Sequence, residues 1–130
     1  MSSILSINNL VKNYSKIKAV NQLSLEVEEG NVYGLLGPNG SGKTTTLGVI
    51  LDVLKKTSGD YTWFGKPSCK ESRKKIGAIL EVPSFFPYLS ARRNLAIIAK
   101  IKGKGTERID EVLDQVGLLD RADDPFKTYS

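Results

Sequence analysis

The sequence predicts an α/β fold that begins with antiparallel β structure, and three observations support this fold class. Leu23, Leu25 and Val27 alternate with polar neighbours, the period of a strand with one buried face. Residues 31–37 form an apolar segment that leads through a glycine-rich loop into a stretch with helical spacing. Two amphipathic helical patterns follow between residues 90 and 117.

Residues 4–36 are expected to form three β segments, SILSINNL, QLSLEVEEG and NVYGLLG. A turn at Glu29-Gly30-Asn31 separates the second segment from the third. The third segment is apolar on both faces, which is typical of a strand inside a covered sheet. We therefore expect an antiparallel β subdomain joined to a strand that carries the glycine-rich loop.

A helix is predicted from Thr44 to about Lys56, with Lys55 and Lys56 in its last turn and Gly59 beyond its end. Its apolar positions have helical spacing: Leu47, Ile50, Leu51 and Leu54. Strand character resumes in DYTWFGK, and IGAILE is expected to form a short apolar strand that ends in Glu81.

Two prolines predict that SFFPYL is a loop. Ser90 is expected to cap one helix, although Arg93 stands where a capping box would have Glu, so its first turn is expected to fray. Thr106 is expected to cap a second helix that stops at Gly117.

The composition excludes several function classes. A single Cys69 allows no internal disulfide, and the absence of His argues against zinc hydrolases and Ser-His-Asp hydrolases. No apolar run approaches the roughly 18 residues that span a bilayer. The net charge of +5 comes from residues 66–105, which contain ten basic residues and two acidic ones. No aromatic residues are interleaved with the basic run 66–75, so a solvated surface is expected there rather than nucleic-acid binding.

Residues 37–44 match the phosphate-loop pattern G-x-x-x-x-G-K-[ST] in full, between an apolar segment and a helical one. Glycines let successive backbone N–H groups turn toward an anion, and the helix N-terminus adds partial positive charge. Lys43 is expected to reach the β and γ phosphates of a bound nucleotide, and Thr44 to ligate Mg²⁺. The predicted nucleotide-binding residues in this region are Gly37, Pro38, Asn39, Gly40, Ser41, Gly42, Lys43, Thr44 and Thr45.

Three features carry a resemblance to a known family: the loop GPNGSGKTT, Tyr14 ahead of it, and the segment IGAILEVPSFFPYLSARRNL after it. Through these features the chain resembles the ATP-binding subunit of an ABC transporter over nearly its whole length. The resemblance implies that Tyr14 stacks on adenine. It also implies that Glu81 contacts Mg²⁺ and the attacking water, where the family usually has Gln. A Glu followed by VPSFFPYLSARRNL is similar to the subgroup that exports bacitracin or lantibiotic peptides.

The resemblance further implies an arrangement of parts. Residues 1–89 would form the β-rich and P-loop NTPase core, and residues 90–130 the start of a helical subdomain. The family's signature segment, Walker B and switch His would follow residue 130, so we expect the front part of one nucleotide-binding domain. Such a part is expected to be inactive in ATP hydrolysis by itself and to self-associate through exposed apolar surface. The implied partners are a membrane permease and a second ATP-binding subunit, at the cytoplasmic face of the cell membrane.

Two other interpretations stay open at the level of sequence. If IGAILE were a Walker B strand, with Glu81 on Mg²⁺, the chain would be a small stand-alone P-loop phosphotransferase. Alternatively, the basic segment would serve a soluble ABC protein that acts on ribosomes or DNA.

Overall fold

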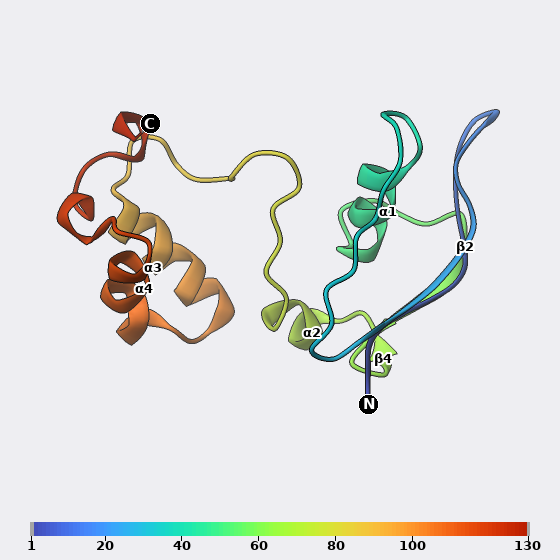
Figure 1. The fold of residues 1–130 in the computed structure, drawn as a ribbon, viewed down its shortest axis with the longest axis horizontal. Helices are drawn as coiled ribbons and strands as arrows, with labels where there is room; N and C mark the ends of the chain where they lie inside the picture. Colours follow the sequence, from blue (N-terminus) through green and yellow to red (C-terminus); the bar gives the residue numbers. More distant parts are fainter. Residues whose placement is uncertain (1, 130) are drawn as a thin grey trace. The chain divides into compact units, whose positions relative to one another are not determined.

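The computed structural model describes residues 2–129 and contains two compact units, Met1–Leu80 and Glu81–Ser130 (Figure 1). The loop 81–89, which the sequence analysis groups with the core, belongs to the second unit. The antiparallel β region and the helices expected from the sequence are confirmed, whereas several element boundaries differ. Each unit is described by itself.

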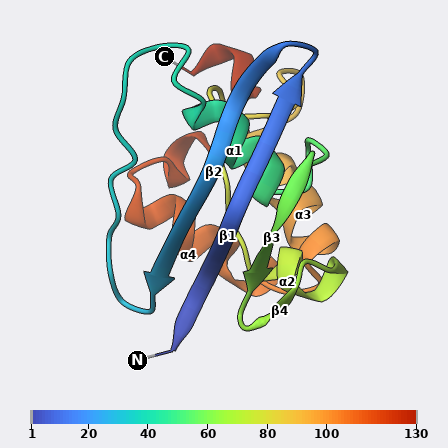
Figure 2. The same cartoon turned by 90° about the vertical axis from the view of Figure 1, so that its right-hand side faces the viewer.

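The first unit is built on a four-stranded antiparallel sheet with strand order β2-β1-β3-β4. The strands are β1 (Ser3–Tyr14), β2 (Ile17–Glu28), β3 (Ser58–Trp63) and the short β4 (Lys66–Pro67). Figure 2 looks onto this sheet, with β1 between β2 and β3 and helix α1 (Lys43–Ile50) behind it. The alternation of Leu23, Leu25 and Val27 thus correctly predicted a strand, since these side chains of β2 pack against the core.

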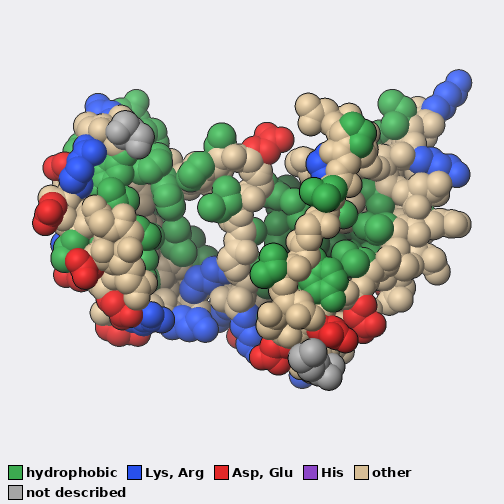
Figure 3. All heavy atoms as spheres, in the orientation of Figure 1, with side chains coloured by type: hydrophobic (Ala, Val, Ile, Leu, Met, Phe, Trp, Pro, Cys, Tyr) green, Lys and Arg blue, Asp and Glu red, His purple; other side chains and the backbone are tan. Residues whose placement is uncertain are grey.

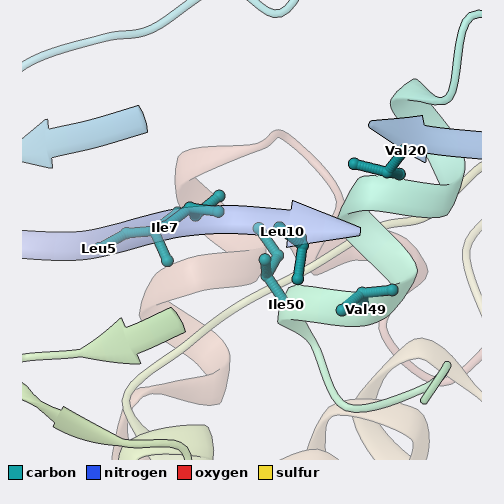
Figure 4. Close-up of a cluster of buried hydrophobic side chains, with 6 residues drawn as sticks. All are labelled: Leu5, Ile7, Leu10, Val20, Val49 and Ile50. Carbon is teal, nitrogen blue, oxygen red and sulfur yellow. The ribbon is translucent and has the colours of Figure 1, made fainter. Parts of the chain in front are cut away.

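The core of the first unit joins the sheet to α1. Leu5, Ile7 and Leu10 of β1 are buried together with three residues from the neighbouring elements (Figure 4): Val20, Val49 and Ile50. Because the isolated helix of eight residues would be marginal in water, this burial is what makes α1 stable. The core therefore holds the helix that follows the phosphate loop against the sheet.

Helix α1 is shorter than predicted and ends at Ile50, so Lys55 and Lys56 lie beyond it. Asp52 takes a left-handed conformation with φ of 62°, and the amides of Val53 and Leu54 both donate to the Gly48 carbonyl. Leu54 then folds back onto Gly48, where a Cβ would lie 2.8 Å from its Cδ1. The apolar spacing of Leu54 reflects this return packing rather than another helical turn.

Two predicted strands are wrong within the described residues. Residues 31–38 and 76–81 pair with no other strand there, although both segments are apolar. The reason is that an apolar sequence becomes a strand only when a neighbour satisfies its backbone groups. In residues 31–38, Val32 is fully exposed and Leu36 is 91% exposed. Figure 3 shows exposed hydrophobic side chains on the face of this unit along which the segment runs in Figure 1.

The basic segment contains a helix that the sequence analysis did not anticipate, α2 (Lys70–Lys74). Its first turn is closed by reciprocal bonds between Cys69 and Ser72, since the Ser72 hydroxyl accepts from the Cys69 amide at 2.9 Å. Ser72 is buried. Cys is a rare residue at a helix N-cap, which explains why the pattern was missed.

The second unit is helical, and residues 84–89 form the predicted loop. Its helices are α3 (Ala91–Lys102) and α4 (Ile109–Gln115), with short 3₁₀ turns η1 (Thr106–Arg108), η2 (Leu119–Arg121) and η3 (Phe126–Thr128). Ala91, Ile109, Leu113 and Ala122 form its buried core. Gly117, at φ 71°, follows α4 as predicted, whereas Thr106 lies inside η1 and does not cap α4.

The start of α3 is held by Ser90 and Asn94. The Ser90 hydroxyl accepts from the Arg93 amide at 3.2 Å, which confirms the predicted cap. Asn94 is 3% exposed; its side-chain amide donates to the carbonyls of Phe86, Leu89 and Ser90, and its side-chain oxygen accepts from the Phe86 amide at 2.8 Å. The expected fraying is wrong because this buried amide replaces the missing capping box.

The packing of Gly59 gives a test of the sheet. A Cβ at Gly59 would lie 2.2 Å from the Asn9 carbonyl oxygen, and Gly59 has φ of 80°. Gly59→Ala is therefore expected to lower the free energy of unfolding by about 2 to 4 kcal/mol. Equilibrium urea unfolding, followed by the fluorescence of Trp63, measures this loss.

The matched control is Gly65→Ala. Gly65 has a similar φ of 74°, but nothing lies within 4 Å of its Cβ position. Only the conformational cost of about 1 to 2 kcal/mol is expected there. Equal losses for the two variants would contradict the close approach of Gly59 to β1.

Candidate functional site

The glycine-rich loop precedes α1 and is shaped by two residues with positive φ, Gly40 at 84° and Gly42 at 96°. The Ser41 amide donates to the Pro38 carbonyl at 3.1 Å, which closes a turn inside the loop. Gly42 is the N-cap of α1, and no side chain among the described residues caps this end. The first amides of α1 and the positive end of its dipole are thus oriented toward the loop, an arrangement suited to anions.

Lys43 is folded back onto this loop. Its ammonium donates to the carbonyl oxygens of Gly37 and Pro38, the second at 2.8 Å, and lies 3.3 Å from the Ser41 hydroxyl. One full positive charge is therefore centred among the residues of the phosphate-loop pattern. A phosphate would compete with carbonyl dipoles for this ammonium, and a charged acceptor is the stronger partner.

A close backbone contact fixes the end of the loop against the sheet. A Cβ at Gly42 would lie 2.1 Å from the carbonyl oxygen of Ala19 in β2, so no other residue fits there. Thr46 adds a second restraint, because its buried hydroxyl donates to the Gly42 carbonyl at 2.8 Å. The sequence analysis missed Thr46, although a third consecutive Thr after the Gly-Lys pair was a visible signal.

Of the predicted threonines, Thr44 is exposed and Thr45 is half-buried. Both lie in the first turn of α1, beside the loop. Among residues 2–129 there is no cluster of three or more acidic or thiol side chains that could hold a metal ion. A Mg²⁺ ion here would need oxygen ligands from phosphate and water in addition to a threonine hydroxyl, as Mg²⁺ commonly has.

Tyr14 is the last residue of β1, and its side chain is 45% exposed. The Lys12 ammonium lies 4.9 Å from the centre of its ring. The β1–β2 hairpin tip and the phosphate loop lie at the same end of the first unit in both Figures 1 and 2. This places an exposed aromatic face and the loop on one end of one compact unit.

Glu81 is the first residue of the second unit and is exposed. The predicted strand that was to carry it, residues 76–81, has no ladder partner among the described residues. The predicted role of Glu81 at Mg²⁺ therefore stays a prediction.

A phosphate loop that is held against β2 at Gly42 and followed by a helix, beside an antiparallel sheet, is the arrangement of ATP-binding cassettes. Residues 20–130 match the family described as ABC transporter, and the chain belongs to that family. The ATP-binding domains of this family bind ATP, generally together with Mg²⁺. No helix within residues 2–129 has the length and apolar character needed to cross a bilayer.

Three comparisons give the range of similarity. The chain is 46% identical to the bacitracin transport ATP-binding protein BcrA of Bacillus licheniformis, over 91% of this chain and 40% of that protein. It is 34% identical to the lantibiotic transport ATP-binding protein SrtF of Streptococcus pyogenes, over 98% of this chain and 56% of that protein. A solved ATP-binding subunit of an ABC transporter superposes with a TM-score of 0.88 at 22% identity, over 98% of this chain and 56% of that one. The chain thus spans about half the length of the relatives it matches.

Proposed function

We propose that this chain binds ATP with Mg²⁺ as part of the ATP-binding subunit of an ABC exporter. The observation that carries the proposal is the Lys43 ammonium, held inside a glycine-shaped loop at the uncapped start of α1. The loop amides and Lys43 would neutralise the β and γ phosphates, and Tyr14 would stack on adenine. Mg²⁺ bound to ATP would supply further countercharge, with Thr44 and Glu81 as its protein ligands.

The transport role is inferred from the relatives. BcrA and SrtF are named as transport ATP-binding proteins for bacitracin and a lantibiotic, so we propose a peptide antibiotic as the cargo. Export would require a membrane permease and a second ATP-binding subunit, with this chain peripheral on the cytoplasmic face of the membrane.

Lys43→Ala tests the phosphate site. The variant should lose about 1.5 to 3 kcal/mol of ATP binding, a ten- to hundredfold weaker Kd, because a charged hydrogen-bond donor is removed. Titration with a fluorescent ATP analogue in excess Mg²⁺ measures the change. Lys55→Ala, which removes an exposed lysine of the same unit, is the control and should bind like the parent. Equal affinities for all three proteins would end the assignment.

Tyr14 tests adenine stacking. Tyr14→Ala should weaken binding by about 1 to 3 kcal/mol, whereas Tyr14→Trp should keep most of the affinity because any aromatic face can stack. Tyr88→Ala, which removes a tyrosine that is 79% exposed in the second unit, is the matched control. GTP should compete with ATP within a few fold; a strong preference for one base would show that hydrogen bonds read it.

We also propose that the chain by itself associates with further copies through residues 31–38. The segment combines exposed apolar side chains with a backbone that pairs with no strand among the described residues. Light scattering on a size-exclusion column should give a dimer or larger species. Val32→Lys should shift the population toward monomer, and a parent that is a stable monomer would contradict the proposal.

A further inference from the structure

Asp52 lies where four parts of the first unit meet. Its carboxylate accepts from the Tyr61 hydroxyl of β3 at 2.5 Å and from the Arg73 guanidinium of α2 at 2.7 Å. It also accepts from the hydroxyl of Ser68, which lies between β4 and α2. The Asp52 backbone itself, at φ 62°, forms the turn that ends α1. One residue therefore both stops the helix and connects its end to the sheet and to α2.

The electrostatics of this cluster favour a charged carboxylate. Burial raises the pKa of Asp52, but hydrogen bonds from Ser68, Tyr61 and Arg73 and the charge of Arg73 outweigh it and hold the pKa below its ordinary value. Burial and the bond to Asp52 raise the pKa of Tyr61 to about 12, so its hydroxyl stays a donor. At neutral pH the three bonds to Asp52 are therefore charge-assisted, the stronger kind.

A second contact holds the same end of the helix. The indole N–H of Trp63 donates to the carbonyl of Ile50, the last residue of α1, at 2.8 Å. Trp63 is the only tryptophan in the sequence. Its emission therefore reports on the end of α1 that Asp52 anchors.

Helix α1 is short and carries the phosphate loop at its other end. Gly42 against Ala19 fixes its start, and Val49 and Ile50 bury one side of it. Val49 and Ile50 are the last residues of α1, so the core, Asp52 and Trp63 together hold its end. A displacement of the end of so short a helix would be carried along its axis to the first amides and to Lys43.

We propose that Asp52 is a positioning residue for nucleotide binding, which fixes the end of α1 and thereby the orientation of Lys43 and the loop amides. This inference rests on the proposed ATP-binding function. Nothing in the phosphate-loop pattern includes Asp52, which lies outside residues 37–44.

Two variants test it. Asp52→Asn keeps a residue that tolerates the left-handed conformation but removes the charge opposite Arg73. Asp52→Gly keeps the turn and removes all three side-chain bonds. We expect Asp52→Gly to bind a fluorescent ATP analogue about three- to tenfold more weakly than the parent, with Asp52→Asn between them. Both variants should also shift the emission maximum of Trp63 in the absence of nucleotide.

Two controls separate positioning from general loss of stability. Asp60→Asn removes another carboxylate of the same unit, the partner of Lys56, and should change neither readout. Val27 packs on the core at the end of β2 that lies away from Ala19, so Val27→Ala lowers the free energy of unfolding at a distance from the phosphate loop. This variant should keep the affinity of the parent for the ATP analogue wherever urea titrations show that it is folded.

Each result decides the question. Weaker binding with shifted Trp63 emission in the Asp52 variants, and in neither control, supports the inference. The inference is overturned if Asp52→Gly binds the ATP analogue as tightly as the parent. It is also overturned if Val27→Ala loses as much affinity as Asp52→Gly at the same stability. If the parent binds no analogue, the proposed function has failed, and the Trp63 emission still decides: an unchanged spectrum in Asp52→Gly overturns the anchoring of α1.

Discussion

The approach of Gly42 to the Ala19 carbonyl is the contact on which the phosphate loop depends. It brings the start of α1 so close to β2 that a single methyl group would not fit. All the other features of the loop are built outward from this point: the turn at Ser41, the bond from Thr46 to the Gly42 carbonyl, and the position of Lys43. The position of the anion-binding end of α1 is therefore set by β2 rather than by the loop itself.

Local chemistry made part of this structure predictable. The alternation in β2, the hydroxyl cap of Ser90 and the glycine stop at Gly117 each act within a few residues, and each was found from the sequence. The phosphate loop was recognisable for the same reason, since its pattern is continuous. Features that are determined by residues close together in the sequence could therefore be predicted from it.

The rest depended on contacts that are distant in sequence. The end of α1 at Ile50 follows from Asp52, whose conformation is supported by Tyr61 and Arg73, and an Asp between apolar residues gives no sign of this. The apolar segment within residues 31–38 was predicted to be a buried strand, but a strand forms only beside a pairing strand, and the sequence of one segment does not show whether such a strand is present. Asn94 was overlooked for a similar reason, since its partners lie in the preceding loop.

The bonds of Asn94 have a mechanical consequence for the segment that carries Glu81. Residues 86–90 are tied to α3 through this one amide, and the backbone at Leu89 and Pro87 also accepts from Phe126 and Lys127. Phe85 adds an edge-to-face contact with Phe126, with ring centres 5.1 Å apart. The loop is thus held to the helices of its own unit as far back as Phe85, four residues after Glu81. Loss of the Asn94 side chain alone would therefore remove the bonds to Phe86, Leu89 and Ser90 together, so the shape of the loop is set from inside α3 rather than by the loop's own sequence.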